Sequence, residues 1–259
     1  MIAERTPHVE RTESDWDQKE MPFTEHLREL RNRLILALAT VGALALVLFW
    51  PSQFVILWMK NTYLPRQIAL HAFAPTDVIF TEFRFSLYGA VVLGLPVILY
   101  QAWMFVVPAV HPRTRRIVYA YVAPSIILAA AGILFSHFFI IHRVIWALIA
   151  ITGQVAQATF GVQPTMNLIL LTFLAFALVF QTPIIIVALA RIGIVNVDLL
   201  RRHRRFIAMG ILLLGGLLAP DASPITMLLI AVPMYALYEV SIWIIVLLER
   251  SWRGGTRRA

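Results

Sequence analysis

Six long apolar segments, separated by short polar connections, decide what this sequence can fold into. They cover residues 34–50 (with a possible continuation past Pro51 to 59), 78–107, 117–141, 166–190, 206–219 and 225–248. A helix needs ~20 apolar residues to cross ~30 Å of hydrocarbon, at ~1.5 Å per residue. Charged residues make up only 14% of the chain, too few to cover a water-soluble globule. The sequence therefore predicts an all-α, polytopic membrane protein with six transmembrane helices.

The apolar region also sets the predicted domain borders. Residues 1–20 are polar and are expected to be disordered, whereas residues 34–248 form the six-helix transmembrane domain and 249–259 a basic cytoplasmic tail. Residues 21–33 are predicted to form a cytoplasmic amphipathic helix, because apolar side chains recur on one helical face. Those side chains are Phe23, Leu27, Leu30 and Leu34.

The distribution of Lys and Arg predicts the orientation. With six spans, the N-terminal segment, the second and fourth connections and the tail hold 18 Lys and Arg, against three in the other connections. Basic residues collect in cytoplasmic loops, so both termini are predicted to be cytoplasmic. The fifth segment has only 14 residues, or ~21 Å as a helix. It is counted as a span because the arginines of the tail would otherwise lie on the outer side of the membrane.

Several function classes are not expected. The chain has no cysteine, which excludes disulfides and thiolate metal sites. It has no recognisable hydrolase, zinc-protease or nucleotide-binding motif, so we predict no enzyme activity, no catalytic residues, no metal and no cofactor. The net charge of +8 is spread over four cytoplasmic connections, so no nucleic acid is expected. A secondary transporter or channel for a small solute stays open as the alternative, although such proteins usually bury more charge.

Four polar residues within the predicted spans have a structural and a functional interpretation. Gln181 precedes Pro183, and its amide either bonds a carbonyl that the proline releases or has a functional role. Glu239 is expected to face a neighbouring helix or to reach toward the cytoplasm. Glu82 and His137 are near an interface and are expected to be solvated.

A set of motifs in fixed order resembles a known family. The motifs are HLRELRNR at 26–33, FTEFR at 80–84, PVILYQAWMFVVPA at 96–109, FQTP at 180–183, APD at 219–221 and AVPMYALYE at 231–239. Each motif is weak alone, but together, with six spans, they resemble TatC, a subunit family of the twin-arginine translocase.

The resemblance implies a function and a location. TatC proteins receive signal peptides with two consecutive arginines from folded cargo in the bacterial or archaeal plasma membrane. They work with TatA/TatB-type single-span partners in a larger complex driven by the proton-motive force, and a homo-oligomer within it is expected. Carried over by motif, the signal-peptide-binding residues are Glu29, Leu30, Arg31, Pro96 and Phe105, and Glu25 and Thr114 are added as candidates. A carboxylate such as Glu29 accepts a guanidinium fork in bidentate geometry.

Three positions, compared with the residues usual in the family, carry specific predictions. Thr114 stands where the family usually has a second acid, and we hypothesise that Glu25, four residues before Glu29, compensates. The alternative is relaxed recognition of the two arginines. Gln181 stands where the family often has Glu and is predicted to hydrate or polarise a cavity without ionising. Asp221 matches the acid of the last outer turn and is predicted to position the last helix.

Overall fold

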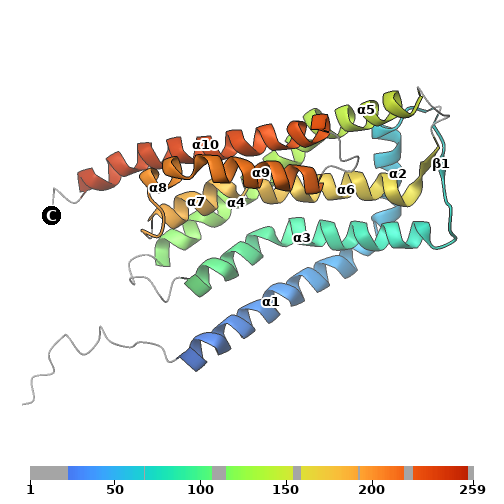
Figure 1. Cartoon of the computed structure of the whole chain (residues 1–259). Coiled ribbons are helices and arrows are strands. Elements are labelled where there is room, and N and C mark those ends of the chain that lie inside the picture. Colours follow the sequence, from blue (N-terminus) through green and yellow to red (C-terminus); the bar gives the residue numbers. More distant parts are fainter. Residues whose placement is uncertain are drawn as a thin grey trace, which may run out of the picture.

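The structure, a computed structural model, is mostly helical, and most of its helices run along one common axis (Figure 1). It describes residues 23–66, 68–106, 115–153, 159–191, 193–218 and 224–255. The predicted polar N-terminus and the final four residues of the tail lie outside this part of the chain.

Proline and short polar breaks divide the chain into its elements. The helices are α1 Phe23–Phe49, α2 Ser52–Tyr63, α3 Asp77–Val106, α4 Arg115–Phe135, the π-helix η4 Ser136–Ile141, α5 His142–Gly153, α6 Val162–Val179, α7 Thr182–Arg191, α8 Val197–Arg202, α9 Arg204–Leu218 and α10 Pro224–Gly255. Pro51 separates α1 from α2 because proline cannot continue the helical hydrogen bonding. Two short strands, β1 Leu70–His71 and β2 Phe160–Gly161, pair in parallel with Leu70 opposite Phe160.

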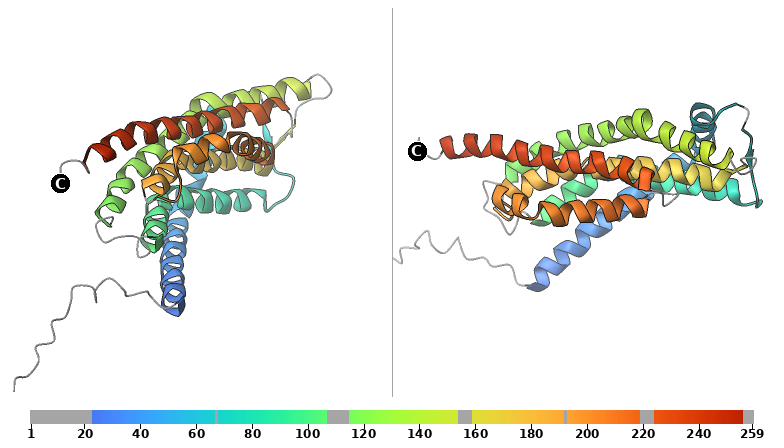
Figure 2. Two further views of the ribbon diagram at one scale, coloured as in Figure 1. Left: turned by 60° about the vertical axis from the view of Figure 1, so that its left-hand side comes forward. Right: turned by 45° about the horizontal axis from the view of Figure 1, so that its top comes forward.

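The helix α3 connects the two sides of the molecule. It packs against α1 on one side and against α4 and α6 on the other, while α10 packs against α9 and α7. In Figures 1 and 2, α1 diverges from the other long helices, and α2 lies across the end of the molecule opposite the α1 N-terminus. None of the residues in the apolar window of α1 is buried. The first helix is therefore attached mainly along one seam, where it meets α3.

Within the residues that the structure describes, five helical stretches are long and apolar enough to cross a membrane. They are Glu25–Phe49, Asp77–Ala102, Tyr121–Ala150, Val162–Arg191 and Met227–Leu248. The predicted fifth segment forms α9, whose 15 residues reach only ~22 Å. In the described part of the chain, α9 does not meet the length of a full span and lies beside α10.

Three predicted boundaries differ from the helices observed, one of them the end of the last helix, α10, which continues past 248 to Gly255. The surface helix at 21–33 and the first span form one continuous helix, α1, because neither Gly nor Pro interrupts the chain between Phe23 and Val41. The helix of the third span does not end at 141 but continues through η4 and α5 to Gly153. Arg143, predicted in a connection, is therefore helical, and its Nη1 donates to the Phe139 carbonyl at 2.8 Å.

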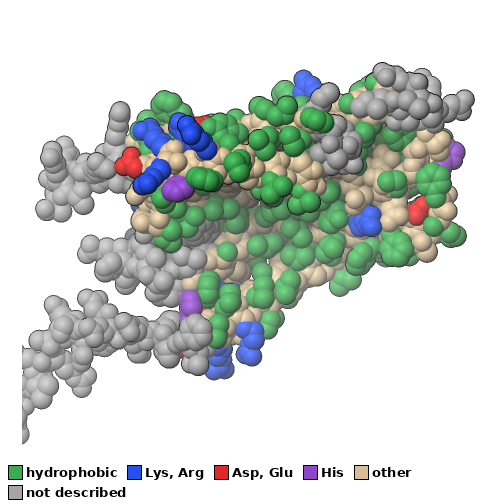
Figure 3. Space-filling model, viewed as in Figure 1, with side chains coloured by type: hydrophobic (Ala, Val, Ile, Leu, Met, Phe, Trp, Pro, Cys, Tyr) green, Lys and Arg blue, Asp and Glu red, His purple; other side chains and the backbone are tan. Residues whose placement is uncertain are grey.

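Close packing in the middle of the bundle depends on one small residue. A Cβ at Gly132 of α4 would lie 2.5 Å from the Phe176 carbonyl oxygen of α6. Small residues let membrane helices approach this closely. Hydrophobic side chains cover the middle of the surface in Figure 3, whereas Lys and Arg gather toward its ends. This surface is typical of a protein in contact with lipid.

Candidate signal-peptide site

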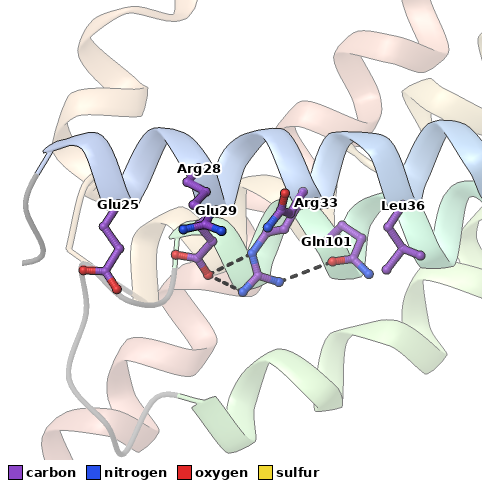
Figure 4. A pocket seen from close by; sticks show the side chains of 7 residues that line it. Glu25, Arg28, Glu29, Arg33, Leu36 and Gln101 are labelled. Atoms are coloured by element: carbon purple, nitrogen blue, oxygen red, sulfur yellow. Dashed lines mark hydrogen bonds and ion pairs between the residues drawn. The ribbon is translucent and has the colours of Figure 1, made fainter.

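A cavity of about 830 Å³ opens between the first turns of α1 and the last turns of α3. Figure 4 shows the Glu25, Glu29 and Arg33 side chains projecting from the same side of α1, toward Gln101 on α3. The spacing of four residues brings these three α1 positions onto one helical face. The lining residues are Glu25, Arg28, Glu29, Asn32, Arg33, Leu36 and Gln101.

An ion pair within α1, which a hydrogen bond connects to α3, holds the Glu29 carboxylate. Arg33 donates to Glu29 Oε1 from Nε at 2.9 Å and also from Nη2. The remaining Nη1 of Arg33 donates to Gln101 Oε1 at 3.3 Å. Because Gln101 belongs to α3 and is buried, the ion pair is fixed against the neighbouring helix.

The second oxygen of the same carboxylate is unsatisfied. Glu29 Oε2 is buried and has no hydrogen-bond partner within the described residues. A buried acceptor left without a partner costs about 1–3 kcal/mol, more when it is charged. The Glu29 side chain as a whole is 22% exposed, so a donor can approach through the cavity. The arrangement can therefore accept one further strong hydrogen-bond donor.

An aromatic contact fixes the same two helix ends. The rings of His26 on α1 and Phe105 on α3 stack with centroids 4.3 Å apart and planes 19° from parallel. Such a contact between rings is worth about 0.5–1.5 kcal/mol beyond its buried area. It joins the first turn of α1 to the last turn of α3.

The structure brings some of the predicted site residues together and separates others. Glu25 and Glu29 line the same cavity. Leu30 and Arg31 are exposed and do not line it. Pro96 lies inside α3, ahead of Gln101. Phe105 does not line the cavity but stacks on His26 of α1, whereas Thr114 and Asp221 lie outside the described residues.

Sequence reasoning missed the residues that hold Glu29 in place. The i, i+4 spacing places Glu29 and Arg33 on one helical face, and the structure joins them in an ion pair. Gln101 lies 68 residues from Arg33, so no local pattern connects the two.

Gln181, at the junction of α6 and α7, is buried and fully hydrogen-bonded. Its Nε2 donates to the carbonyls of Ala177 at 3.2 Å and Ser125 at 3.3 Å, and its Oε1 accepts from Ser125 Oγ at 3.0 Å. The Ala177 carbonyl is available because the Gln181 N–H bonds to Leu178 instead, where the helix breaks before Pro183. This geometry favours the structural interpretation of Gln181 over a role in hydrating a cavity.

Glu239 of α10 pairs with a neighbouring element. Its Oε2 accepts from Arg204 Nη2 of α9 at 2.9 Å, and its Oε1 accepts from the Tyr235 hydroxyl at 2.9 Å. On the same helix, the Tyr238 hydroxyl donates to the Leu200 carbonyl of α8 at 2.8 Å. These bonds connect α8 and α9 to α10.

Two residues expected to be solvated have protein surroundings instead. Glu82 is only 6% exposed. His137 is half-buried and its Nδ1 is hydrogen-bonded to the Tyr63 hydroxyl. Burial raises the pKa of Tyr63 to about 12. Helix α2 contacts η4 through this Tyr63–His137 bond. Considering each segment of the sequence separately does not predict such a contact. No group of three or more His, Asp or Glu in the described part of the chain is placed to hold a metal ion.

Comparisons with known proteins settle the family. The model of the family described as "Sec-independent protein translocase protein (TatC)" matches residues 25–233. The chain belongs to the TatC family. It is 31% identical to TatCy of Bacillus subtilis (strain 168), covering 87% of this chain and 89% of that protein. It is 30% identical to TatC of Aquifex aeolicus (strain VF5), covering 86% and 94%.

Solved structures agree with the TatC assignment. A crystal structure of the twin-arginine translocase receptor TatC in DDM superposes with a TM-score of 0.75 at 28% identity, covering 85% of this chain and 98% of that chain. TatC proteins are components of a protein translocase, so the chain is a membrane protein-transport subunit rather than a member of a catalytic enzyme family. The expectation from its motifs is confirmed at this level.

Proposed function

We propose that this TatC-family chain is the receptor for twin-arginine signal peptides, and that Glu29 accepts the guanidinium of a signal arginine. The observation that carries the proposal is the buried Oε2 of Glu29, which has no described partner and adjoins an open cavity. An arginine fork supplies parallel donors in the plane of a carboxylate, which a lysine ammonium does not. Recognition of arginine rather than of positive charge alone follows from this geometry.

A second carboxylate is available for the second arginine. Glu25 lines the same cavity, one helical turn before Glu29. It is exposed and has no described side-chain bond. We propose that Glu25 takes the part of the family acid that Thr114 replaces. Relaxed recognition, with only one arginine read closely, is the alternative.

Arg33 and Gln101 orient the receptor carboxylate. Arg33 occupies Glu29 Oε1 and is itself held by Gln101, which leaves Oε2 for the incoming peptide. Without this support the Glu29 side chain is free to turn toward water. Among the predicted binding residues, we assign Leu30, Arg31, Pro96 and Phe105 to the surroundings of the site.

The apolar part of a signal peptide has a matching surface farther along α1. A second cavity of about 520 Å³ is lined almost entirely by apolar side chains of α1, α2, α3, α4 and α6, including Leu48, Phe85 and Leu170. Leu48 is 12 residues beyond Leu36 of the first cavity, or ~18 Å along a helix. The 7–15 apolar residues typical of a signal peptide cover a comparable length as a helix. We propose that they follow the α1–α3 seam toward this cavity.

The proposed orientation has six spans with both termini in the cytoplasm. Here α9 is the short fifth span, and its mismatch with the bilayer is relieved by local bilayer thinning or by a protein neighbour. Its exposed apolar residues Met209, Leu213 and Leu217 recur at helical spacing and suit a single-span TatA/TatB-type partner. A larger complex in the bacterial or archaeal plasma membrane, driven by the proton-motive force, completes the proposal.

Site-specific photocrosslinking tests the receptor proposal. A photoreactive amino acid replaces Asn32, which lines the cavity and leaves Glu29 intact, and the signal peptide carries either Arg-Arg or Lys-Lys. Crosslinking to Arg-Arg that falls away with Lys-Lys supports the twin-arginine receptor. Equal crosslinking to both peptides supports relaxed recognition, and no crosslinking with folded protein contradicts the proposal.

The alternative, a transporter or channel for a small solute, makes a different prediction. It requires solute uptake by the purified chain alone in liposomes. The described Arg204–Glu239 ion pair joins the first residue of α9 to α10 and pairs these two charges with each other, which leaves little charge for an ion path. Uptake without partner subunits would favour this alternative.

A further inference from the structure

A polar cavity of about 510 Å³ lies at the opposite end of the molecule, where α2 leads into β1. Its walls include two cations, Lys60 in the last turn of α2 and Arg66 beyond the helix end, with the amide of Asn61 between them. The apolar part of the wall comes from Leu64, Ile68 and Ala69. None of these residues belongs to the proposed signal-peptide site.

The two cations have no internal counter-charge. Among the described residues, neither the Lys60 nor the Arg66 side chain makes a hydrogen bond or an ion pair. The C-terminal carbonyls of α2 favour a cation at Lys60, but they do not account for Arg66, which follows the helix. Two unpaired cations in one concavity leave it a site of positive potential.

The position of these cations runs against the overall charge distribution. In the proposed orientation only Lys60, Arg66 and Arg143 lie in the outer connections predicted from the sequence, against 18 Lys and Arg on the cytoplasmic side. Topology alone keeps outer loops poor in Lys and Arg. Two of these three cations nevertheless line a single cavity, whereas the third bonds within its own helix.

Helix α2 places the cavity at the level of lipid headgroups. It crosses the end of the bundle (Figure 1) and exposes Phe54, Leu57 and Trp58 along one side. Exposed aromatic residues of this kind belong at the membrane–water interface, where an amphipathic helix lies in the interface plane. At the C-terminal end of the same helix the surface changes from apolar to cationic.

From this juxtaposition we propose that the Lys60–Asn61–Arg66 cavity binds a phosphate group. Arg supplies a planar donor fork for the phosphate oxygens, Lys a point charge and Asn a neutral donor. Two sources share this chemistry, the headgroup of an anionic phospholipid in the outer leaflet and free inorganic phosphate. The apolar walls beside the cations fit the glycerol and first methylenes of a lipid, which inorganic phosphate lacks.

Lipid titration of the delipidated full-length protein tests the proposal. Binding of phosphatidylglycerol, phosphatidylcholine and inorganic phosphate is counted by native mass spectrometry for wild type, the double variant K60Q/R66Q and the control R201Q/R202Q. The control removes two exposed cations at the other end of the molecule. We expect K60Q/R66Q to weaken phosphatidylglycerol binding about tenfold or more, with a smaller loss in the control.

The results of this titration distinguish a phospholipid headgroup from free inorganic phosphate as the ligand. Phosphatidylglycerol binding that inorganic phosphate does not displace supports a lipid site, and equal binding of inorganic phosphate alone supports a free-anion site. Equal losses in the two double variants, or no loss in K60Q/R66Q, overturn the proposal. Retained signal-peptide binding by K60Q/R66Q verifies its fold and keeps this test independent of the receptor function.

Discussion

Two polar clusters that join helices of the bundle differ in whether their hydrogen bonds are complete. Gln181 and Ser125 join the α6–α7 junction to α4, and every polar atom of the Gln181 amide has a partner inside the protein. Glu29, Arg33 and Gln101 join α1 to α3, but one carboxylate oxygen is left without a partner beside a cavity. A satisfied buried network rigidifies a fold. An unsatisfied one next to an opening is available for a ligand.

A substitution at Glu29 tests this difference with the largest expected effect. We expect Glu29→Gln to weaken Arg-Arg signal-peptide binding about 10- to 100-fold, because a charge-assisted hydrogen bond of about 1.5–3 kcal/mol is lost. Fluorescence anisotropy with a labelled peptide measures the affinity. Asp198→Asn, an exposed acid in the first turn of α8, is the matched control and should bind as wild type does. Unchanged binding in Glu29→Gln would remove this residue from the receptor site.

Gln181→Leu should lower stability and leave signal-peptide binding nearly unchanged. The substitution removes three hydrogen bonds and leaves the Ser125 hydroxyl without its amide partner, so we expect unfolding to become easier by about 1–3 kcal/mol. Signal-peptide affinity should stay within twofold of wild type. Unfolding in detergent and peptide binding are measured on the same preparation. Full stability together with lost transport would instead support the cavity role predicted from the sequence.

Gln101→Leu tests whether α3 orients the receptor carboxylate. The variant removes the acceptor that holds Arg33 but keeps both members of the ion pair, so we expect peptide affinity to fall about three- to tenfold. Asn32→Leu changes a neighbouring cavity residue that makes no described side-chain bond and serves as the control. Equal effects of the two variants would argue against a positioning role for Gln101.

The smallest expected effect belongs to Glu25. This carboxylate is exposed, so water screens its attraction for an arginine, and we expect Glu25→Gln to weaken binding about two- to threefold. The effect should disappear when the second signal arginine is changed to glutamine, as a double-mutant cycle would report. If transport and affinity are intact in Glu25→Gln, this residue does not compensate for the acid replaced by Thr114.

Features that depend on local pattern were predictable. Apolar length identified the helices that cross the membrane, and the i, i+4 spacing of Glu25, Glu29 and Arg33 placed them on one face. The end of the first predicted span was harder, because Pro51 separates α1 from α2 and α2 then turns across the bundle. His137 was expected to be solvated because its partner, Tyr63, lies on α2, 74 residues away, and no local pattern connects the two.

The sequence by itself determined the membrane class, the positions of the apolar helices and the TatC family, and it indicated the acid that we propose as the arginine acceptor. Only the tertiary structure decided which Glu29 oxygen is occupied and which is open. Which oxygen is occupied depends on Gln101, 68 residues from Arg33, because Gln101 holds the Arg33 side chain. In the same way, the complete hydrogen bonding of Gln181 depends on Ser125, 56 residues away. Helical periodicity fixes which side chains share a face. The partner that each face meets is set by how separate helices pack, since hydrogen bonds between helices require distant segments to align within about 3 Å.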